Sequence, residues 1–417
     1  MYFTEERIKR ILHELSGYIY PDTEKIPSYK MKQGNFKGGE QVDLDDSSWD
    51  TFTAGERWGG RDIHYWFRTD VVIPDRFDGK TVVFEIKTGK EKAWDATNPQ
   101  FLIYLNGKLI QGLDVNHRQI VISEKAKSGD KYKIALHAYS GMEDSLSLLE
   151  TQLAVLDRNV EKLYYDIKVP LDIALLQDSQ DKRRIDILNY LNDAINMLDL
   201  RKPHSPEFNK SVLEADAYLD SEFYKKYCGV DDVIATCVGH THIDVAWLWT
   251  VSQTREKAAR SFSTVINLMK QYPEYIFMSS QPQLYKFVKE DHPELYEEIK
   301  KMIAEGRWEP EGAMWLEADC NLSSGESLVR QVLFGTRFFE EEFGIKSKVL
   351  WLPDVFGYSA ALPQILKKSG IDYFMTTKIS WNEYNKVPYD TFMWKGMDGT
   401  EILTHFITTK DAGFKLN

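Results

Sequence analysis

From about residue 231 onward, short apolar runs alternate with longer amphipathic runs. The short runs have the length of β-strands, whereas the longer ones carry apolar residues at the spacing of α-helices. This alternation predicts parallel strands joined by crossover helices. No glycine-rich nucleotide-binding turn follows the first strand, so we expect a partial (β/α)7-type barrel over residues 231–417. An open doubly wound sheet is the structural alternative.

The earlier part of the chain has other periodicities. Residues 1–34 start with a run at helical spacing, which predicts an N-terminal helix and extension. Residues 35–140 contain short β-rich runs separated by turn residues, and this pattern predicts an antiparallel β-sandwich. Asn106 and Gly107 stand between two of these runs and are typical of a tight hairpin. Residues 141–230 return to helical spacing and predict a helical connecting region.

Composition narrows the classes of partner. The net charge of −12 argues against nucleic acid or an anionic membrane surface as a partner. No apolar run is long enough to span a bilayer. The three cysteines, Cys228, Cys237 and Cys320, are too few and too scattered for a disulfide framework, so we expect a reducing, cytoplasmic location. A homo-oligomer is left open.

The stretch VGHTHIDVAWLW, residues 238–249, concentrates polar chemistry directly after the first predicted strand of the barrel. It places His240, His242 and Asp244 within five positions. Side chains two residues apart leave a strand on the same side, so His242 and Asp244 are able to share one ion. Their donor atoms suit Zn²⁺ and its neighbours. The ordinary alternative is a set of hydrogen-bonded loop histidines.

Further polar residues follow the later predicted strands. Glu311 and Asp319 come after the third strand, Asp354 after the fourth and Lys378 after the fifth. In a barrel, the residues just past the C-terminal ends of the strands form one face, so we expect these groups to converge on the histidine stretch. Glu311 has two interpretations, as an acid/base or as a capping carboxylate.

Four segments resemble a known family: GHTHIDVAWLW, EGRWEPEGAMWLEADCNLSSGESLVRQ, WLPDVFGYSAALPQIL and YFMTTKISWNEYN. Their order and spacing resemble those of the retaining α-mannosidases of glycoside hydrolase family 38. The resemblance is strong over residues 231–417. The preceding region is similar to the N-terminal part of the long cytosolic and bacterial branch of that family.

The resemblance implies a metal-dependent retaining exo-α-mannosidase that hydrolyses terminal α-mannosyl residues of oligosaccharides. It implies that His242 and Asp244 bind one Zn²⁺, with Co²⁺ as an alternative, and that Asp354 is both a metal ligand and the nucleophile. The implied partner is a mannose-containing oligosaccharide.

Three further residues are substrate-binding candidates by the same resemblance. Trp247 is expected to stack on the sugar ring. Lys378 is expected near the site by its position, and Asp319, in the Glu317-x-Asp319 pair, to hydrogen-bond sugar hydroxyls.

The family pattern also includes a fourth metal ligand and a general acid/base well downstream of the nucleophile. We therefore expect residues 1–417 to be a truncated fragment with an incomplete barrel, inactive by itself.

Two other classes of protein remain open at this point. The His240-Thr-His242 pattern also resembles amidohydrolases, which cleave C–N or ester bonds at one or two metals. The chain is alternatively a non-catalytic carbohydrate-binding protein with Trp58, Trp66 and Trp94 on a sandwich surface, although core packing is the more ordinary role for such rings.

Overall fold

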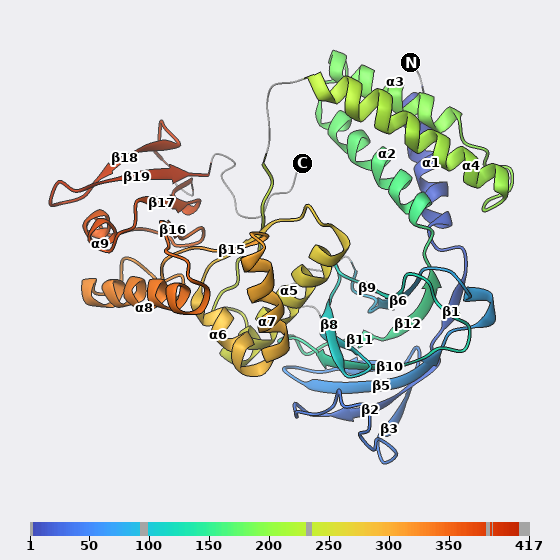
Figure 1. Cartoon of the computed structure of the whole chain (residues 1–417), viewed down its shortest axis with the longest axis horizontal. Helices are drawn as coiled ribbons and strands as arrows, with labels where there is room; N and C mark the ends of the chain where they lie inside the picture. The colour runs from blue at the N-terminus through green and yellow to red at the C-terminus, as the bar shows by residue number, and fades with distance from the viewer. Residues whose placement is uncertain (1–2, 92–98, 231–235, 381–383, 386, 408–417) are drawn as a thin grey trace.

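The computed structural model describes residues 3–91, 99–230, 236–380, 384–385 and 387–407. A β-sandwich lies at the lower right in Figure 1. A group of helices lies at one end of the sandwich, and a β–α region packs on its other side through helix α5.

The sandwich has two antiparallel sheets. The first has the order β1-β12-β6-β9, with bounds Thr23–Lys25, Glu150–Val155, Val82–Lys87 and Gln119–Ser123. The second has the order β3-β2-β5-β10-β7-β8, with bounds Asp50–Thr53, Ser28–Gln33, His64–Val72, Lys131–Tyr139, Gln100–Leu105 and Lys108–Leu113. A short pair joins β4 (Arg57–Gly59) to β11 (Leu146–Leu148). The antiparallel sandwich expected from the alternating pattern is confirmed.

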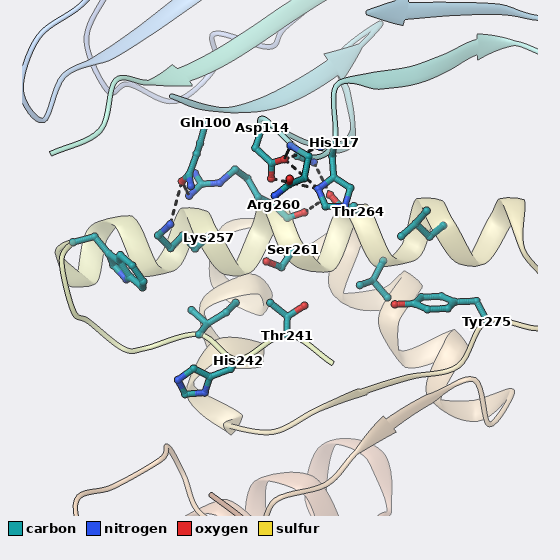
Figure 2. Close-up of a pocket in the computed structure, with 16 residues that line it drawn as sticks. Gln100, Asp114, His117, Thr241, His242, Lys257, Arg260, Ser261, Thr264 and Tyr275 are labelled. Atoms are coloured by element: carbon teal, nitrogen blue, oxygen red, sulfur yellow. Dashed lines mark hydrogen bonds and ion pairs between the residues drawn. The ribbon is translucent and has the colours of Figure 1, made fainter. Parts of the chain in front are cut away.

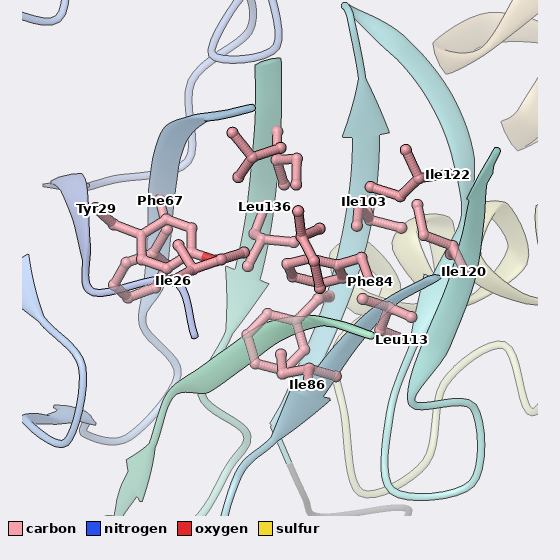
Figure 3. Close-up of a cluster of buried hydrophobic side chains, with 14 of the residues drawn as sticks. Ile26, Tyr29, Phe67, Phe84, Ile86, Ile103, Leu113, Ile120, Ile122 and Leu136 are labelled. Atoms are coloured by element: carbon pink, nitrogen blue, oxygen red, sulfur yellow. The ribbon is translucent and has the colours of Figure 1, made fainter. Parts of the chain in front are cut away.

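Side chains from both sheets fill the space between them (Figure 3). Phe84 on β6 meets Phe67, Ile103 and Leu136 from the second sheet in one buried cluster. The hairpin prediction is also confirmed, because β7 and β8 pair around Asn106 and Gly107, whose φ angles are 51° and 82°.

The sandwich is larger than the range 35–140 that the sequence predicted. Strands β1 and β2 precede that range, and β11 and β12 follow it. The helical pattern assigned to the start of 141–230 was therefore wrong for residues 146–155. All three residues of β1 are exposed and β11 has only three residues, so neither leaves a readable alternation.

Four helices form one apolar cluster beside the sandwich. They are α1 (Thr4–Tyr18), α2 (Arg158–Leu176), α3 (Lys182–Asn196) and α4 (Pro206–Tyr218). Helix α1 is thus part of the helical group although 139 residues separate its end from the start of α2. Asp157 and Ser205 cap α2 and α4 by accepting backbone N–H groups of the first turn. Short helical turns over Leu219–Tyr227 and Cys228–Val230 follow.

In the β–α region, strands and helices alternate along the chain. Strands β13 (Gly239–His240), β14 (Phe277–Ser279) and β15 (Trp308–Pro310) pair in parallel. Strands β16 (Val349–Trp351), β17 (Tyr373–Thr376) and β19 (Glu401–Phe406) form a second parallel set, to which β18 (Thr391–Lys395) adds in antiparallel orientation. The intervening helices are α5 (Val251–Gln271), α6 (Pro282–Asp291), α7 (Pro293–Ala304), α8 (Gly325–Phe343) and α9 (Leu362–Lys368).

The parallel strands lie in chain order, and a bridge between Gly312 and Leu350 connects the two sets. This order lacks the reversal of a doubly wound sheet. Over the described residues, however, the strands form two open sheets and not the closed ring of a barrel. The first predicted strand falls partly on residues 231–235, outside the described residues. Within the described ranges, every helix is too short or too polar to cross a membrane.

Candidate active site

The C-terminal ends of the parallel strands carry the polar side chains of the site. His242 and Asp244 follow β13, Asp354 follows β16 and Lys378 follows β17. Parallel strands end at one edge of a sheet, which is why residues more than a hundred positions apart meet here. The convergence expected from the sequence is observed for these four residues.

Gln281 holds two of the contributing loops together. It follows β14, is buried, and has a positive φ of 65°. Its side-chain N–H donates to the Ile243 carbonyl at 2.9 Å, and its side-chain oxygen accepts the Glu317 N–H at 3.2 Å. The loop after β13 is thereby tied to the loop after β15. Sequence reasoning missed Gln281, because neither its charge nor its spacing marks it.

The centre of the site is a histidine between carboxylates. The Nε2 atom of His242 lies 3.3 Å from Oδ1 of Asp244 and 3.3 Å from Oδ2 of Asp354. One ligand atom from each of the three residues lies within 4.8 Å of the others. His242 Nε2 is buried, yet it has no hydrogen-bond partner of acceptable geometry. A buried ring nitrogen without a partner is costly, so this atom is suited to bind something that the protein does not itself provide.

Glu317 lies on the other side of the His242 ring. Its Oε2 atom is 3.1 Å from His242 Nδ1, and Ser280 Oγ donates to its Oε1 at 3.3 Å. Only 7% of the Glu317 side chain is exposed. A carboxylate behind a histidine holds the proton on Nδ1 and leaves Nε2 free to bind a metal. The sequence pointed to the Glu317-x-Asp319 pair, but the contact that matters for His242 comes from Glu317.

The carboxyl groups and the basic side chains of the site shift one another's pKa values. Burial lowers the pKa of His242, but Asp244, Asp354 and Glu317 outweigh it and raise the pKa to about 12. Burial raises the pKa of Glu317, against the opposing effect of His242. Burial also raises the pKa of Asp354, but His242 and Lys378 together lower it below its usual value. At this pKa a proton on His242 balances the surrounding carboxylates, and a divalent cation at Nε2 would take the place of that proton.

Lys378 forms a direct ion pair in the site. Its Nζ atom lies 2.6 Å from Oδ1 of Asp354, and its side chain is nearly fully buried. The two oxygens of Asp354 therefore face different groups, Oδ1 toward Lys378 and Oδ2 toward His242.

His240 has its hydrogen bonds satisfied within the protein. Its Nδ1 donates to the Met278 carbonyl at 3.0 Å, and its Nε2 accepts the indole N–H of Trp351 at 3.3 Å. Burial lowers the pKa of His240, which keeps the ring neutral, as this pattern requires. The ordinary interpretation, a hydrogen-bonded loop histidine, therefore describes His240 but not His242.

The other two substrate-binding candidates are Trp247 and Asp319. Trp247 is 56% exposed and meets Trp249 edge to face, and the Trp249 indole N–H donates to the Asp244 carbonyl at 3.2 Å. Asp319 Oδ1 accepts the backbone N–H groups of Asn321 and Leu322 in a local turn.

Glu311 accepts the N–H groups of Gly312 and Lys348 at 2.9 and 3.1 Å and so connects the end of β15 to the start of β16. Burial raises the pKa of its carboxyl group. These contacts favour the capping interpretation of Glu311 over the acid/base one.

A cavity of about 330 Å³ adjoins the site between the sandwich and α5 (Figure 2). Gln100 and Asp114 from the sandwich and Arg260 from α5 line one side, and Thr241 and His242 lie on the other. Arg260 donates to Gln100, so the polar groups on the sandwich side are largely paired with one another.

Trp58 and Trp66 are 3% and 2% exposed. Trp58 packs between the two sheets, whereas Trp66 packs on the other face of the second sheet, in a cluster with Ala259 of α5. Both rings are therefore packing residues, as the more ordinary interpretation expected, and not a lectin surface. Trp94 lies outside the described residues.

Two family domains match this chain. Residues 232–412 match the N-terminal domain of glycosyl hydrolases family 38, and residues 21–143 match the jelly roll domain of α-mannosidase.

Curated relatives match over most of this chain. Alpha-mannosidase G of Dictyostelium discoideum is 35% identical over 91% of this chain and 35% of its own length. Alpha-mannosidase 2C1 of Mus musculus is 34% identical over 94% of this chain and 37% of its own length. Alpha-mannosidase of Saccharomyces cerevisiae is 42% identical over 60% of this chain and 24% of its own length. The chain thus spans about a third of the length of the first two relatives. On its sequence motifs, its strand-end residues and these matches, the chain belongs to glycoside hydrolase family 38, the α-mannosidase family.

Proposed function

We propose that this chain carries the nucleophile and three metal ligands of a metal-dependent retaining exo-α-mannosidase, which removes terminal α-mannosyl residues from oligosaccharides. One observation carries the proposal. The unpartnered Nε2 of His242 faces the carboxylates of Asp244 and Asp354, while Glu317 holds the opposite edge of the ring.

The residues present fit one Zn²⁺, with Co²⁺ as the alternative. One imidazole nitrogen and two carboxylates form a ligand set that zinc commonly takes, and a carboxylate behind the histidine is the usual support. His242, Asp244 and Asp354 would hold the ion. A divalent cation there would supply a positive charge to orient sugar hydroxyls and to stabilise the charge of the transition state.

Asp354 is the proposed nucleophile. Its lowered pKa keeps it ionised, as a carboxylate nucleophile must be. In a retaining reaction, Asp354 attacks the anomeric carbon while the general acid of the full-length protein protonates the leaving oxygen, and the same group later takes a proton from the water that hydrolyses the glycosyl ester. The carboxylate loses its charge when the ester forms, so its ion pair with Lys378 weakens in that step and forms again after hydrolysis.

Lys378 and Trp247 are proposed to position the reacting groups and the sugar. The short ion pair fixes the orientation of the Asp354 carboxylate, and correct orientation is a large part of catalysis by such a group. Trp247 offers an exposed aromatic face beside the loop of Asp244, suitable for the C–H side of a sugar ring. Asp319 is a proposed partner of sugar hydroxyls through Oδ2, because Oδ1 serves the local turn.

The proposal concerns the full-length protein, since the relatives' matched part is about a third of their length. For residues 1–417 alone we propose no measurable activity, because the resemblance assigns the acid/base and the fourth metal ligand to a later part of the family sequence. The acid/base alone contributes about 10²–10⁴-fold in rate. We also propose a cytoplasmic location, because the three cysteines of the chain are too few and too scattered for a disulfide framework.

One contact disfavours an amidohydrolase. In the His-x-His pattern of that class both histidines serve the metal, whereas both ring nitrogens of His240 are already hydrogen-bonded. Of these two histidines, His242 alone has a ring nitrogen available to a metal.

Hydrolysis by the full-length protein tests the function. We expect release of 4-nitrophenol from 4-nitrophenyl α-mannoside, loss of this activity after removal of metal with a chelator, and recovery with Zn²⁺ or Co²⁺. Turnover of amide or ester substrates in place of the mannoside would support the amidohydrolase. Sugar binding without any turnover would support the carbohydrate-binding protein.

A further inference from the structure

A second group of metal-binding residue types lies where the sandwich meets helix α5. His64 on β5, His137 on β10 and Glu256 on α5 each place one ligand atom within 4.8 Å of the others. His64 Nε2 lies 2.8 Å from Glu256 Oε1. None of these residues belongs to the site described above, and they come from two different parts of the fold.

Two buried polar atoms at this place have no partner. They are Nε2 of His137 and Oε1 of Gln253. The His137 ring is held between Trp66, with centroids 4.5 Å apart, and His64, with centroids 5.3 Å apart, and both pairs are stacked. The orientation of the ring is therefore fixed, although its nitrogen meets no hydrogen-bonding group. Native proteins seldom leave such an atom without a function.

The hydrogen bonds at His64 are in conflict. Its Nε2 meets the Glu256 carboxylate at 2.8 Å and the side-chain nitrogen of Gln253 at 2.9 Å. The first contact needs a proton on Nε2, whereas the second needs a lone pair there. With the Gln253 amide in this orientation, one ring nitrogen is unable to satisfy both. A cation at this point would remove the conflict, because the lone pair of His64 and the carboxylate of Glu256 would both bind it. The Gln253 oxygen would bind it too, once that amide has turned over.

We propose that His64, His137 and Glu256 bind one zinc-class divalent cation that fastens α5 to the sandwich. Two imidazole nitrogens and one carboxylate form an established zinc ligand set, and Gln253 or water completes it. Zinc–ligand bonds place neighbouring ligand atoms about 3.3 Å apart. His64 Nε2 and Glu256 Oε1 therefore separate by about 0.5 Å when the ion binds. A cavity of about 370 Å³, which His137 and Glu256 line, supplies a path for entry.

The same helix supports the proposed active site. Thr254, two residues before Glu256, donates its hydroxyl to the Asp244 carbonyl at 3.4 Å. A cation at Glu256 would thus fix the first turns of α5, on which the Asp244 loop rests. We expect its main effect on thermal stability, with a smaller effect on catalysis.

Zinc content of the full-length protein tests the proposal. The protein would be purified without a metal-affinity tag, incubated with excess Zn²⁺, desalted and measured by mass spectrometry. We expect His137→Phe to contain one zinc fewer per chain than the wild type. Phe retains the stacking between Trp66 and His64 but lacks the ligand nitrogen. Both proteins keep the His242 site, so whatever that site binds cancels in the difference.

A Glu256→Gln variant is a second route to the same loss, and Tyr139→Phe is the matched control. The Tyr139 ring contacts His64 but offers no ligand, so its variant should retain the full zinc content. The melting temperature separates the proposal from simple packing. A chelator should lower it further in the wild type than in a folded His137→Phe, because loss of metal from the His242 site affects both proteins equally. Equal zinc in the wild type and in both ligand variants, or an unchanged or higher melting temperature in His137→Phe, would overturn the proposal.

Discussion

The carboxylate of Glu317 lies 3.1 Å from Nδ1 of His242, on the side of the ring opposite Asp244 and Asp354. Glu317 stands 75 positions after His242 in the chain. The contact fixes which nitrogen of His242 faces the two other carboxylates, so it determines whether the loop after β13 is able to bind a metal at all.

We therefore expect Glu317→Gln to weaken zinc binding by the full-length protein about 10–100-fold, since the supporting carboxylate is lost while the ligands remain. His242→Ala should weaken it further. Competition with a chromophoric chelator measures the affinity. Asp319→Asn, two residues away, is the control and should leave zinc affinity unchanged. A Glu317→Gln variant with wild-type affinity would contradict the role assigned to the contact.

Asp354→Asn should reduce turnover of the full-length protein by several orders of magnitude, because the amide is a poor nucleophile and a weaker metal ligand. Steady-state kinetics on an activated α-mannoside measures the loss. A fluorinated mannosyl reagent should trap the glycosyl ester on Asp354, and peptide mapping identifies the labelled residue. A label on another carboxylate would remove Asp354 from the role of nucleophile.

Gly335→Ala should destabilise the β–α region. A Cβ atom at this position of α8 would lie 2.0 Å from the Ala313 carbonyl oxygen, in the segment that leads to Glu317. Backbone atoms there have little freedom to move, because Trp315 and Leu316 donate to the backbone and side chain of Gln331 on the same helix. Such overpacking costs about 1–3 kcal/mol.

The matched control for this substitution is Gly325→Ala at the start of α8, where a Cβ atom would meet no heavy atom within 4 Å. Thermal unfolding should show a lower melting temperature for Gly335→Ala and nearly the wild-type value for Gly325→Ala. Equal melting temperatures would show that α8 does not pack as closely on this segment as the structure indicates.

A polypeptide of residues 1–417 should fold in its sandwich but hydrolyse no activated α-mannoside measurably, even with excess Zn²⁺ or Co²⁺. Far-ultraviolet circular dichroism checks the fold, and the activity assay uses the full-length protein as the reference. Turnover near that of the reference would mean that the acid/base lies within these residues, and it would direct attention to Glu311 and Asp319.

Several features of the fold followed from local sequence alone. The alternating apolar pattern predicted the antiparallel sandwich, and Asn106-Gly107 predicted its β7–β8 hairpin, because both positions need a positive φ. The strand–helix alternation predicted parallel pairing in the second half. The short strands β1 and β11 escaped prediction, because three residues carry too little periodicity to read. Closure into a barrel was not observed over the described residues.

For the site, the sequence by itself determined which residues stand at the ends of strands: His242, Asp244, Asp354 and Lys378. Spacing and the family resemblance singled out His242 with Asp244 as ligands. They did not say what His240 does, and they did not separate Glu317 from Asp319, which are two carboxylates of one loop. Only the tertiary structure decided these cases. It brought Met278 and Trp351 to both nitrogens of His240, and it buried Glu317 against His242 while Asp319 capped its own turn. The physical reason is that free ligand atoms are those left over after every long-range hydrogen bond has formed, and such partners are not encoded by local spacing.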